Sequence, residues 1–305
     1  GARIENILHF KNDYPDYRLY KLEQNYRSTQ NIVNAANSII ARNQGQIHKK
    51  VFSRKESGEK ILVSRAMTDA EEGYLVANAI QDIHYDTKTP FREFAVLYRT
   101  NAQSRIFEEV LRRKNIPYKV YGAMSFYQRK EIKDLLAYFR IVSNPSDDEA
   151  LKRIINYPAR GIGKTTMDRL VELSNKKDLP IWELITTPAA GEAGLNRGML
   201  SRLEGFTVLI RSFMEKKGSS DAYQLAMEIA SATGILRDLY NQDSPEELSR
   251  YENIQELLNG IREFTENAAE EGGETGMEQY LENVSLLTDL DTDAAEDNDR
   301  VKIMT

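Results

Sequence analysis

Residues 158–166 read PARGIGKTT and resemble a phosphate-binding loop. Such a loop needs a glycine, four free positions and then Gly-Lys-Ser/Thr, so that backbone amides and the lysine surround the phosphates. The position of the first glycine is taken here by Pro158, which has no N–H and a fixed φ. The apolar residues of the preceding stretch, 151–158, have helical spacing, whereas a phosphate loop follows a strand. The pattern therefore argues against an ATP phosphate loop.

The same stretch has the features of a contact to a nucleic-acid backbone. Glycines at positions 161 and 163 allow the backbone to approach a phosphate, and a helix that begins near Lys164 directs amides and its dipole at negative charge. Arg160 and Lys164 supply positive charge, and Thr165 is expected to cap the helix. This is the logic of a helix-hairpin-helix loop, which reads no sequence. A tight turn between two helices is the alternative.

A second candidate site lies in LEQNYRST, residues 22–29, where a predicted strand meets a predicted helix. In open α/β sheets, ligands bind in the crevice at the carboxyl ends of the strands. Tyr26 can stack on a base, and Arg27 can donate to phosphate oxygens. In the alternative interpretation, the tyrosine packs on the sheet and Arg27 pairs with Glu23.

A third candidate lies in VLYRTNAQS, residues 96–104, again at the end of a predicted strand. Arg99 and Asn101 provide a phosphate donor and an amide at the same edge of the sheet. The alternative is an Asx turn in which Asn101 caps the following helix.

Composition excludes several classes of site. With 305 residues the chain is long enough for two domains, and no apolar run is long enough to cross a membrane. Cysteine is absent, and the three histidines are scattered through the first third without metal-ligand spacing. We therefore expect no metal site and no disulfides.

Charge is distributed unevenly along the chain. Residues 1–200 contain 32 Lys and Arg against 24 Asp and Glu, whereas residues 201–305 contain 9 against 23. The net charge of −6 thus conceals a basic first part, which suits contact with a polyanion, and an acidic last part. Two ordinary solvated surfaces are the alternative.

The elements that must position these residues change in type along the chain. Strand patterns alternate with helical patterns up to about residue 126, which predicts a mostly parallel sheet with helices on both faces. The expected strands are residues 17–23, 61–66, 94–100, 118–122 and a final one beginning in VKIMT, and the expected helices are about 28–40, 70–84 and 102–115. Ser28 or Thr29 is expected to cap the first of these helices.

From about residue 127 the patterns are almost wholly helical. Ser146 with Glu149 predicts a capping box, and Ser244 followed by Pro245 predicts another helix start. The fold class is therefore α/β, interrupted by a helical insertion of roughly 165 residues and then resumed.

Four stretches in this order, LEQNYRST, VLYRTNAQSR, SFYQRKEIKDLLAYFR and PARGIG, closely resemble the UvrD/PcrA/Rep group of superfamily 1 DNA helicases. The resemblance covers essentially the whole chain, is strongest over residues 17–170 and is weak from about 180 to 285. LEQNYRST is its most specific part. GARIENIL resembles the segment after the group's third motif, and VKIMT resembles the strand that enters the fifth.

The resemblance implies a domain organisation. Residues 1–16 would be the tail of a first motor domain, and 17–126 the first part of a second, RecA-like motor domain. Residues 127–290 would be a helical accessory domain, and 291–305 the return into the motor domain. Because the chain opens without methionine and stops as an apolar strand begins, we expect it to be a piece of a longer protein.

The resemblance also implies roles for individual residues. Tyr26 would stack on the adenine of ATP, and Arg27 would reach the γ-phosphate as an arginine finger. The single-stranded DNA track would include Arg99, Thr100 and Asn101. The duplex-contacting loop would be Arg160, Gly161, Ile162, Gly163, Lys164 and Thr165.

The family's phosphate loop, its Mg²⁺-binding Asp-Glu pair and its later motifs do not occur in this sequence. We therefore expect ATP and Mg²⁺ to serve the full-length protein, with the Mg²⁺ ligands outside this chain, and the chain alone to hydrolyse no ATP. The implied function is 3′-to-5′ ATP-dependent translocation on DNA in repair and replication, in the bacterial cytoplasm. The implied partners are single-stranded DNA, duplex DNA and the first motor domain, with no membrane.

Two other functions stay open at this level. One is a non-enzymatic helix-hairpin-helix DNA-binding adaptor, and the other is a self-sufficient nucleotide hydrolase that uses GIGKTT.

Overall fold

The structure, a computed structural model, describes residues 9–10, 12–43, 45–240, 244–289 and 299–305. The chain divides into two compact units, Gly1–Arg65 and Ala66–Thr305, and each is described by itself. The stretch GARIENIL, residues 1–8, and the acidic segment 290–298 lie outside the described residues. The predicted boundaries after residues 16, 126 and 290 differ from this division and remain predictions.

The first unit contains the amphipathic helix α2, over Gln30–Ile40. The side chain of Val33, on this helix, is buried. The strands predicted over 17–23 and 61–66 are wrong for this structure, because the only ladder contact near them is an isolated parallel bridge between Gln24 and Phe52. An alternating pattern selects a strand only where a neighbouring strand supplies backbone partners.

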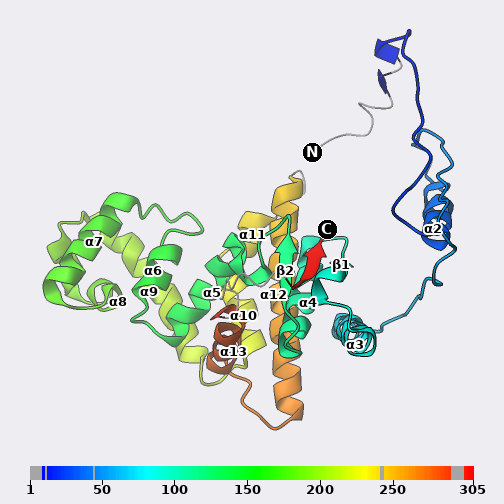
Figure 1. Cartoon of the computed structure of the whole chain (residues 1–305). Coiled ribbons are helices and arrows are strands. Elements are labelled where there is room, and N and C mark those ends of the chain that lie inside the picture. The colour runs from blue at the N-terminus through cyan, green and yellow to red at the C-terminus, as the bar shows by residue number, and fades with distance from the viewer. Residues whose placement is uncertain (1–8, 11, 44, 241–243, 290–298) are drawn as a thin grey trace. The chain divides into compact units, whose positions relative to one another are not determined.

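The second unit contains a parallel sheet of three strands. Strands β1 (Ala95–Leu97) and β2 (Tyr118–Tyr121) both pair with β3 (Val301–Met304), so the order is β1-β3-β2. Figure 1 shows β3, in red, between the two strands that precede it by most of the chain length. The α/β fold class is confirmed, as is the expectation that the chain returns to the sheet after a helical insertion.

One face of the sheet is covered by helices α3 (Asp69–Thr87) and α4 (Ser104–Arg113). Thr68 caps α3, since its Oγ1 accepts the N–H of Glu71 at 3.1 Å. The apolar side chains of strands and helices form one small core, whose main members are Ala77, Ile80, Val96, Ile106, Val110, Leu111, Val301 and Ile303.

The rest of the unit is helical. Its α-helices are α5 (Lys130–Ser143), α6 (Asp148–Ile154), α7 (Lys164–Lys177), α8 (Ile181–Ile185), α9 (Arg197–Lys216), α10 (Ala222–Ala232), α11 (Ile235–Leu239), α12 (Pro245–Glu270) and α13 (Met277–Asp289). Short 3₁₀ turns occur at Phe91–Glu93, Asn101–Gln103, Phe126–Gln128 and Pro188–Ala193.

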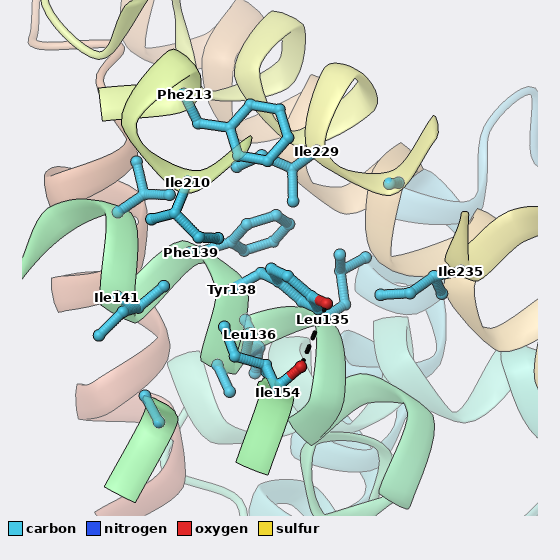
Figure 2. Close-up of a cluster of buried hydrophobic side chains, with 14 of the residues drawn as sticks. Leu135, Leu136, Tyr138, Phe139, Ile141, Ile154, Ile210, Phe213, Ile229 and Ile235 are labelled. Atoms are coloured by element: carbon cyan, nitrogen blue, oxygen red, sulfur yellow. Dashed lines mark hydrogen bonds between the residues drawn. The ribbon is translucent and has the colours of Figure 1, made fainter. Parts of the chain in front are cut away.

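A larger core holds these helices together around α5. Leu135, Tyr138 and Phe139 of α5 are fully buried among side chains from α6, α9, α10 and α11 (Figure 2). The pKa of Tyr138 is raised to about 12, and burial of the side chain is the largest cause. Its hydroxyl donates to the carbonyl oxygen of Ile154 at 3.4 Å and to that of Tyr157.

The predicted helix starts had mixed outcomes. Ser244 caps α12 through its Oγ, which accepts the N–H of Glu247 at 3.4 Å, and Pro245 is the first helical residue, so this prediction is confirmed. The capping box at Ser146 is wrong: α6 is capped one residue later, where Asp147 Oδ1 accepts the N–H of Ala150 at 2.9 Å. An aspartate and a serine have similar capping preference, so sequence alone does not separate adjacent candidates.

Candidate nucleotide and nucleic-acid sites

Tyr26 and Arg27 lie in a tight turn between the Gln24 bridge and helix α2. The side-chain oxygen of Asn25 accepts the N–H groups of Arg27 and Ser28 at 2.8 and 2.9 Å. On the opposite side, the ammonium of Lys55 donates to the carbonyl of Arg27 at 2.7 Å. The backbone of the turn is therefore fixed while the Tyr26 ring stays 75% exposed.

The Arg27 side chain is exposed, and among the described residues no carboxylate pairs with it. The interpretation in which Arg27 pairs with Glu23 is wrong, because the Glu23 carboxylate instead accepts the N–H of Lys50 at 3.3 Å. The ring of Tyr26 is exposed, so within this unit it does not pack on a sheet. An aromatic ring and a guanidinium thus stand next to each other on a held turn.

The start of helix α2 is closed to a ligand. Neither Ser28 nor Thr29 caps it, contrary to the prediction, and Thr29 makes no side-chain cap bond. The carbonyls of Glu56 and Ser57 instead accept the N–H groups of Gln30 and Asn31 at 3.1 and 3.0 Å. A phosphate near this turn would therefore meet Arg27, not helix amides.

The second candidate site follows β1. The side chains of Arg99 and Thr100 are exposed, and Gln103 Oε1 accepts both of their N–H groups, at 2.9 and 3.0 Å. The alternative in which Asn101 caps the next helix is wrong, because Asn101 is the first residue of a 3₁₀ turn whose cap position is Thr100, and Gln103 occupies the cap position of α4. The carbonyl of Asn101 accepts a bond from Arg129 at 3.0 Å. We call residues 99–101 the strand-end loop.

In the third candidate site, Arg160 points into the protein. Its Nη1 donates to the carbonyls of Ile154, Tyr157 and Pro158 at 3.1, 3.0 and 3.2 Å. The guanidinium also lies over the ring of Phe206, 5.5 Å from its centroid. Arg160 Nη1 therefore helps to hold the loop in shape, and the phosphate contact expected from the sequence stays a prediction.

The loop after Arg160 is shaped by Gly161 and by Asn156. Gly161 has φ +70°, and its carbonyl accepts a bond from Arg202 Nη1 at 2.9 Å. The side-chain oxygen of Asn156 accepts the N–H groups of Arg160 and Ile162, both at 3.0 Å. Ile162 is 1% exposed and anchors the loop in the core. Its side chain therefore supports the loop from the inside.

Helix α7 begins directly after this loop, with Gly163 at the cap position. The prediction that Thr165 caps it is wrong, since Thr165 lies inside the first turn. Lys164 and Thr165 are exposed, the first turn has no acidic residue, and within the described part of the chain no backbone carbonyl accepts their N–H groups. Free amides and a lysine at the start of a 14-residue helix favour an anion there.

The interpretation of GIGKTT as a phosphate loop is also contradicted by the preceding element. Helix α6 ends at Ile154, so this loop joins two helices and not a strand to a helix. Among the described residues, no group of three His, Asp or Glu side chains has the arrangement of a metal site. In the same part of the chain, no helix combines the length and apolar character that crossing a bilayer requires.

Sequence reasoning missed the polar residues beneath the strand-end loop. Arg129, Glu108 and Asn253 are buried charged or polar side chains, exposed by 7%, 1% and 4% respectively. Arg129 lies in the stretch SFYQRKEIKD, whose basic residues alone would suggest a solvated face. Burial of a lone arginine between elements far apart in sequence leaves no local periodic signal.

The chain belongs to the family of UvrD-like helicase C-terminal domains, which it matches over residues 20–305. It is 36% identical to the ATP-dependent DNA helicase PcrA of Staphylococcus aureus over 308 positions, and 34% identical to that of Leuconostoc citreum over 307. These matches cover 100% of this chain and 41% of each relative, so the chain spans about two fifths of their length. The resemblance seen in the sequence is thereby confirmed.

Proposed function

We propose that the protein containing this chain is an ATP-dependent DNA helicase that moves 3′ to 5′ along single strands. In this proposal the chain supplies one side of the ATP cleft, part of the single-stranded DNA track and a helical part that meets the duplex. The proposal is supported above all by the exposed Arg27, unpaired among the described residues and held beside Tyr26 in a chain of this family.

Each side chain has a defined task in this proposal. Hydrolysis of ATP supplies the free energy of movement, and Mg²⁺ would be held by residues outside this chain. Tyr26 presents its exposed face to the adenine, and Arg27 donates to the γ-phosphate, where negative charge increases during transfer. The Asn25 turn holds the Arg27 backbone, so the side chain need not be ordered from a mobile segment.

DNA contacts follow from the other two loops. Arg99 and Thr100 offer exposed donors for a single strand, and Lys164 with the open start of α7 offers donors for a duplex backbone. Such contacts carry no sequence information, which suits a protein that must process any DNA. We propose a role in DNA repair and replication in the bacterial cytoplasm.

The nucleotide role is tested by Arg27→Ala in the full-length protein. Because the guanidinium acts mainly on the transferring phosphoryl group, we expect DNA-stimulated ATP turnover to fall by about 10³ or more, with ATP affinity changed by less than about tenfold. Arg42→Ala, which removes an exposed arginine after the end of α2, serves as the matched control and should leave turnover unchanged.

Three results would contradict this reading. Equal losses in turnover and affinity would remove the finger role, and unchanged turnover would remove Arg27 from the site. A full-length protein that binds DNA but shows no ATP turnover would support the adaptor function instead.

The duplex role is tested by Lys164→Ala. Loss of one phosphate contact should weaken duplex binding and reduce the slope of log K against log salt by about 0.9. Lys176→Ala, in the last turn of the same helix, is the control and should leave the slope unchanged. If both variants behave alike, the 158–166 loop is a turn without a DNA contact.

A further inference from the structure

A single buried guanidinium connects three elements beneath the strand-end loop. Arg129 Nη1 donates to the carbonyl of Asn101 at 3.0 Å and to Asn253 Oδ1 at 2.8 Å, and its Nη2 donates to Ser104 Oγ at 2.8 Å. Asn101 belongs to the loop, Ser104 begins α4, and Asn253 lies in α12. Since Arg129 is only 7% exposed, these bonds are shielded from competing water.

The strand-end loop is consequently held at each of its residues. Gln103 Oε1 fixes the N–H groups of Arg99 and Thr100, and Arg129 fixes the carbonyl of Asn101. The side chains of Arg99 and Thr100 nevertheless point to solvent and are exposed. The backbone of the loop is thus held by hydrogen bonds, while the side chains of Arg99 and Thr100 are accessible to a ligand.

The link to α12 depends on the orientation of one amide. Asn253 accepts from Arg129 through Oδ1 and donates through Nδ2 to Glu131 Oε1 at 2.7 Å. Exchanging the amide oxygen and nitrogen would place a donor against the guanidinium and an acceptor against the carboxylate, so only this orientation satisfies both neighbours. Helix α12 also packs along the Asn101–Gln103 turn. Any displacement of α12 at Asn253 is therefore transmitted to the loop.

Carboxylates of Glu108 and Glu131 act on the buried Arg129 guanidinium. Burial lowers the pKa of Arg129, and Glu108 opposes that effect. An arginine side chain stays protonated in proteins, so the guanidinium is the cation that the surrounding acceptors require. Glu108 is itself 1% exposed, and its carboxylate accepts the N–H of Phe126 at 3.1 Å. The Arg129 guanidinium lies over the ring of Phe126, 5.1 Å from the centroid. Its position is thus set by packing as well as by hydrogen bonds.

We propose that Arg129 is a positioning residue for single-stranded DNA binding: it sets the strand-end loop in register with α12 so that Arg99 meets the phosphate backbone. This inference rests on the proposed single-stranded DNA role of residues 99–101. Because the guanidinium bonds the loop and α12 at once, strand binding at the loop and the placement of α12 are coupled. An arginine is required, since its planar fork reaches acceptors in three elements, which a single ammonium cannot match.

The test measures binding of a fluorescent oligothymidylate to the full-length protein over a range of salt. Arg129→Lys should weaken binding about 5–10-fold and reduce the salt slope by about 0.7, as expected for one lost phosphate contact on a single strand. Arg129 is itself too buried to supply that contact, so the change in slope reports Arg99. In an Arg99→Ala background, Arg129→Lys should cause no further loss.

Arg105→Lys provides the matched control. Arg105 is 1% exposed and also joins α4 to α12, through Glu256, but the structure gives it no bond to the strand-end loop. We expect it to lower thermal stability without changing the salt slope of strand binding. If Arg129→Lys does not fold, Asn253→Ala, which removes the acceptor on α12, takes its place. It should also weaken strand binding and reduce the salt slope, by smaller amounts than expected for Arg129→Lys.

The outcomes separate the two proposals. If Arg99→Ala changes neither affinity nor slope, the single-stranded DNA role of the loop is wrong. If Arg99→Ala has its effect but Arg129→Lys leaves the slope unchanged, or if the two losses simply add in the double variant, Arg129 does not position Arg99. If Arg105→Lys lowers the slope equally, the effect is general loosening of the junction, and the inference fails.

Discussion

Replacing Arg105 by glutamine should strongly destabilise the second unit. Arg105 is 1% exposed, and its guanidinium pairs with Glu109 on α4 at 3.1 Å and with two carboxylates on α12. Those two are Glu256 at 2.7 Å and Glu263 at 3.2 Å. Figure 1 shows α12 as a long helix alongside α4, so this cluster joins the sheet to the helical part. The substitution keeps a polar side chain, although a shorter one, and leaves the carboxylates without a cation.

The magnitude follows from the cost of an unpaired buried charge. Burial is the largest single influence and lowers the pKa of Arg105, but Glu109, Glu256, Tyr127 and Glu263 all raise it. Their combined effect places the pKa well above its ordinary value, so the pairing is net favourable to the cation. Removing one partner from a buried ion pair typically costs about 3–5 kcal/mol. For a unit of this size that corresponds to a fall in Tm of about 6–20 °C.

The loss should depend on pH in a defined direction. Burial is the largest cause that raises the pKa of Glu256 above its ordinary value, and Arg105 lowers it. A carboxyl whose pKa is raised on folding stabilises the folded chain below its unfolded pKa, and this contribution is lost as pH rises through the folded pKa. Without Arg105, the pKa of Glu256 in the folded state rises further. The difference between variant and unmodified chain should therefore shrink as pH falls from about 7 to 5.

Thermal unfolding followed by far-UV circular dichroism at both pH values measures this effect. Arg250→Gln is the matched control, because Arg250 forms an i,i+4 pair with Glu246 on α12 at 2.6 Å and is 39% exposed in its side chain. An exposed pair of this type contributes about 0.3–0.5 kcal/mol, so the control should change Tm by about 2 °C or less. A loss below 1 kcal/mol for Arg105→Gln, or a loss that grows as pH falls, would refute the reasoning.

Two further predictions concern local structure. Ser244→Ala removes the cap of α12 and should lower the free energy of unfolding by about 1 kcal/mol. Urea unfolding measures this loss, and the m-value should stay unchanged. An effect below about 0.3 kcal/mol would mean that the N–H of Glu247 finds another acceptor. Gly161→Ala should cost about 1–2 kcal/mol and weaken duplex binding, because Gly161 has φ +70° and an added Cβ would lie 2.6 Å from Arg202 Nη1. Gly163→Ser is the contrasting variant, since Gly163 caps α7 with φ −82° and open space around it, and it should raise stability by a few tenths of a kcal/mol. Equal losses for the two glycine variants would show that backbone strain at Gly161 is not the cause.

Local sequence patterns predicted most of the helices and the three strands of the sheet that the structure describes. The apolar stripe of α5, the Ser-Pro start of α12 and the run around Val96 are properties of neighbouring residues, so periodicity reveals them. The same reasoning failed for residues 17–23 and 61–66, because strand formation also requires a paired neighbour. It also chose the wrong cap at Ser146, since Asp147 is chemically equivalent.

Candidate site residues were recognised through their motifs, but their tasks were decided by the fold. Tyr26 and Arg27 are both exposed, as stacking on a base and donation to a phosphate require, and those roles stay a proposal. Arg160 looked like a phosphate ligand, yet its Nη1 donates to the backbone carbonyls of Ile154, Tyr157 and Pro158. No one-dimensional pattern distinguishes an arginine that faces solvent from one that folds back onto its own backbone.

By itself, the sequence determined the class of the protein, the order of its α/β and helical parts and the loops at which chemistry is expected, because each is encoded in contiguous residues. Only the tertiary structure brought together Arg129, Asn101 and Asn253, and likewise Arg105 with its carboxylates on α12. The contacts to α12 join residues more than a hundred positions apart, and a buried charge is stable only where the fold supplies every partner at once.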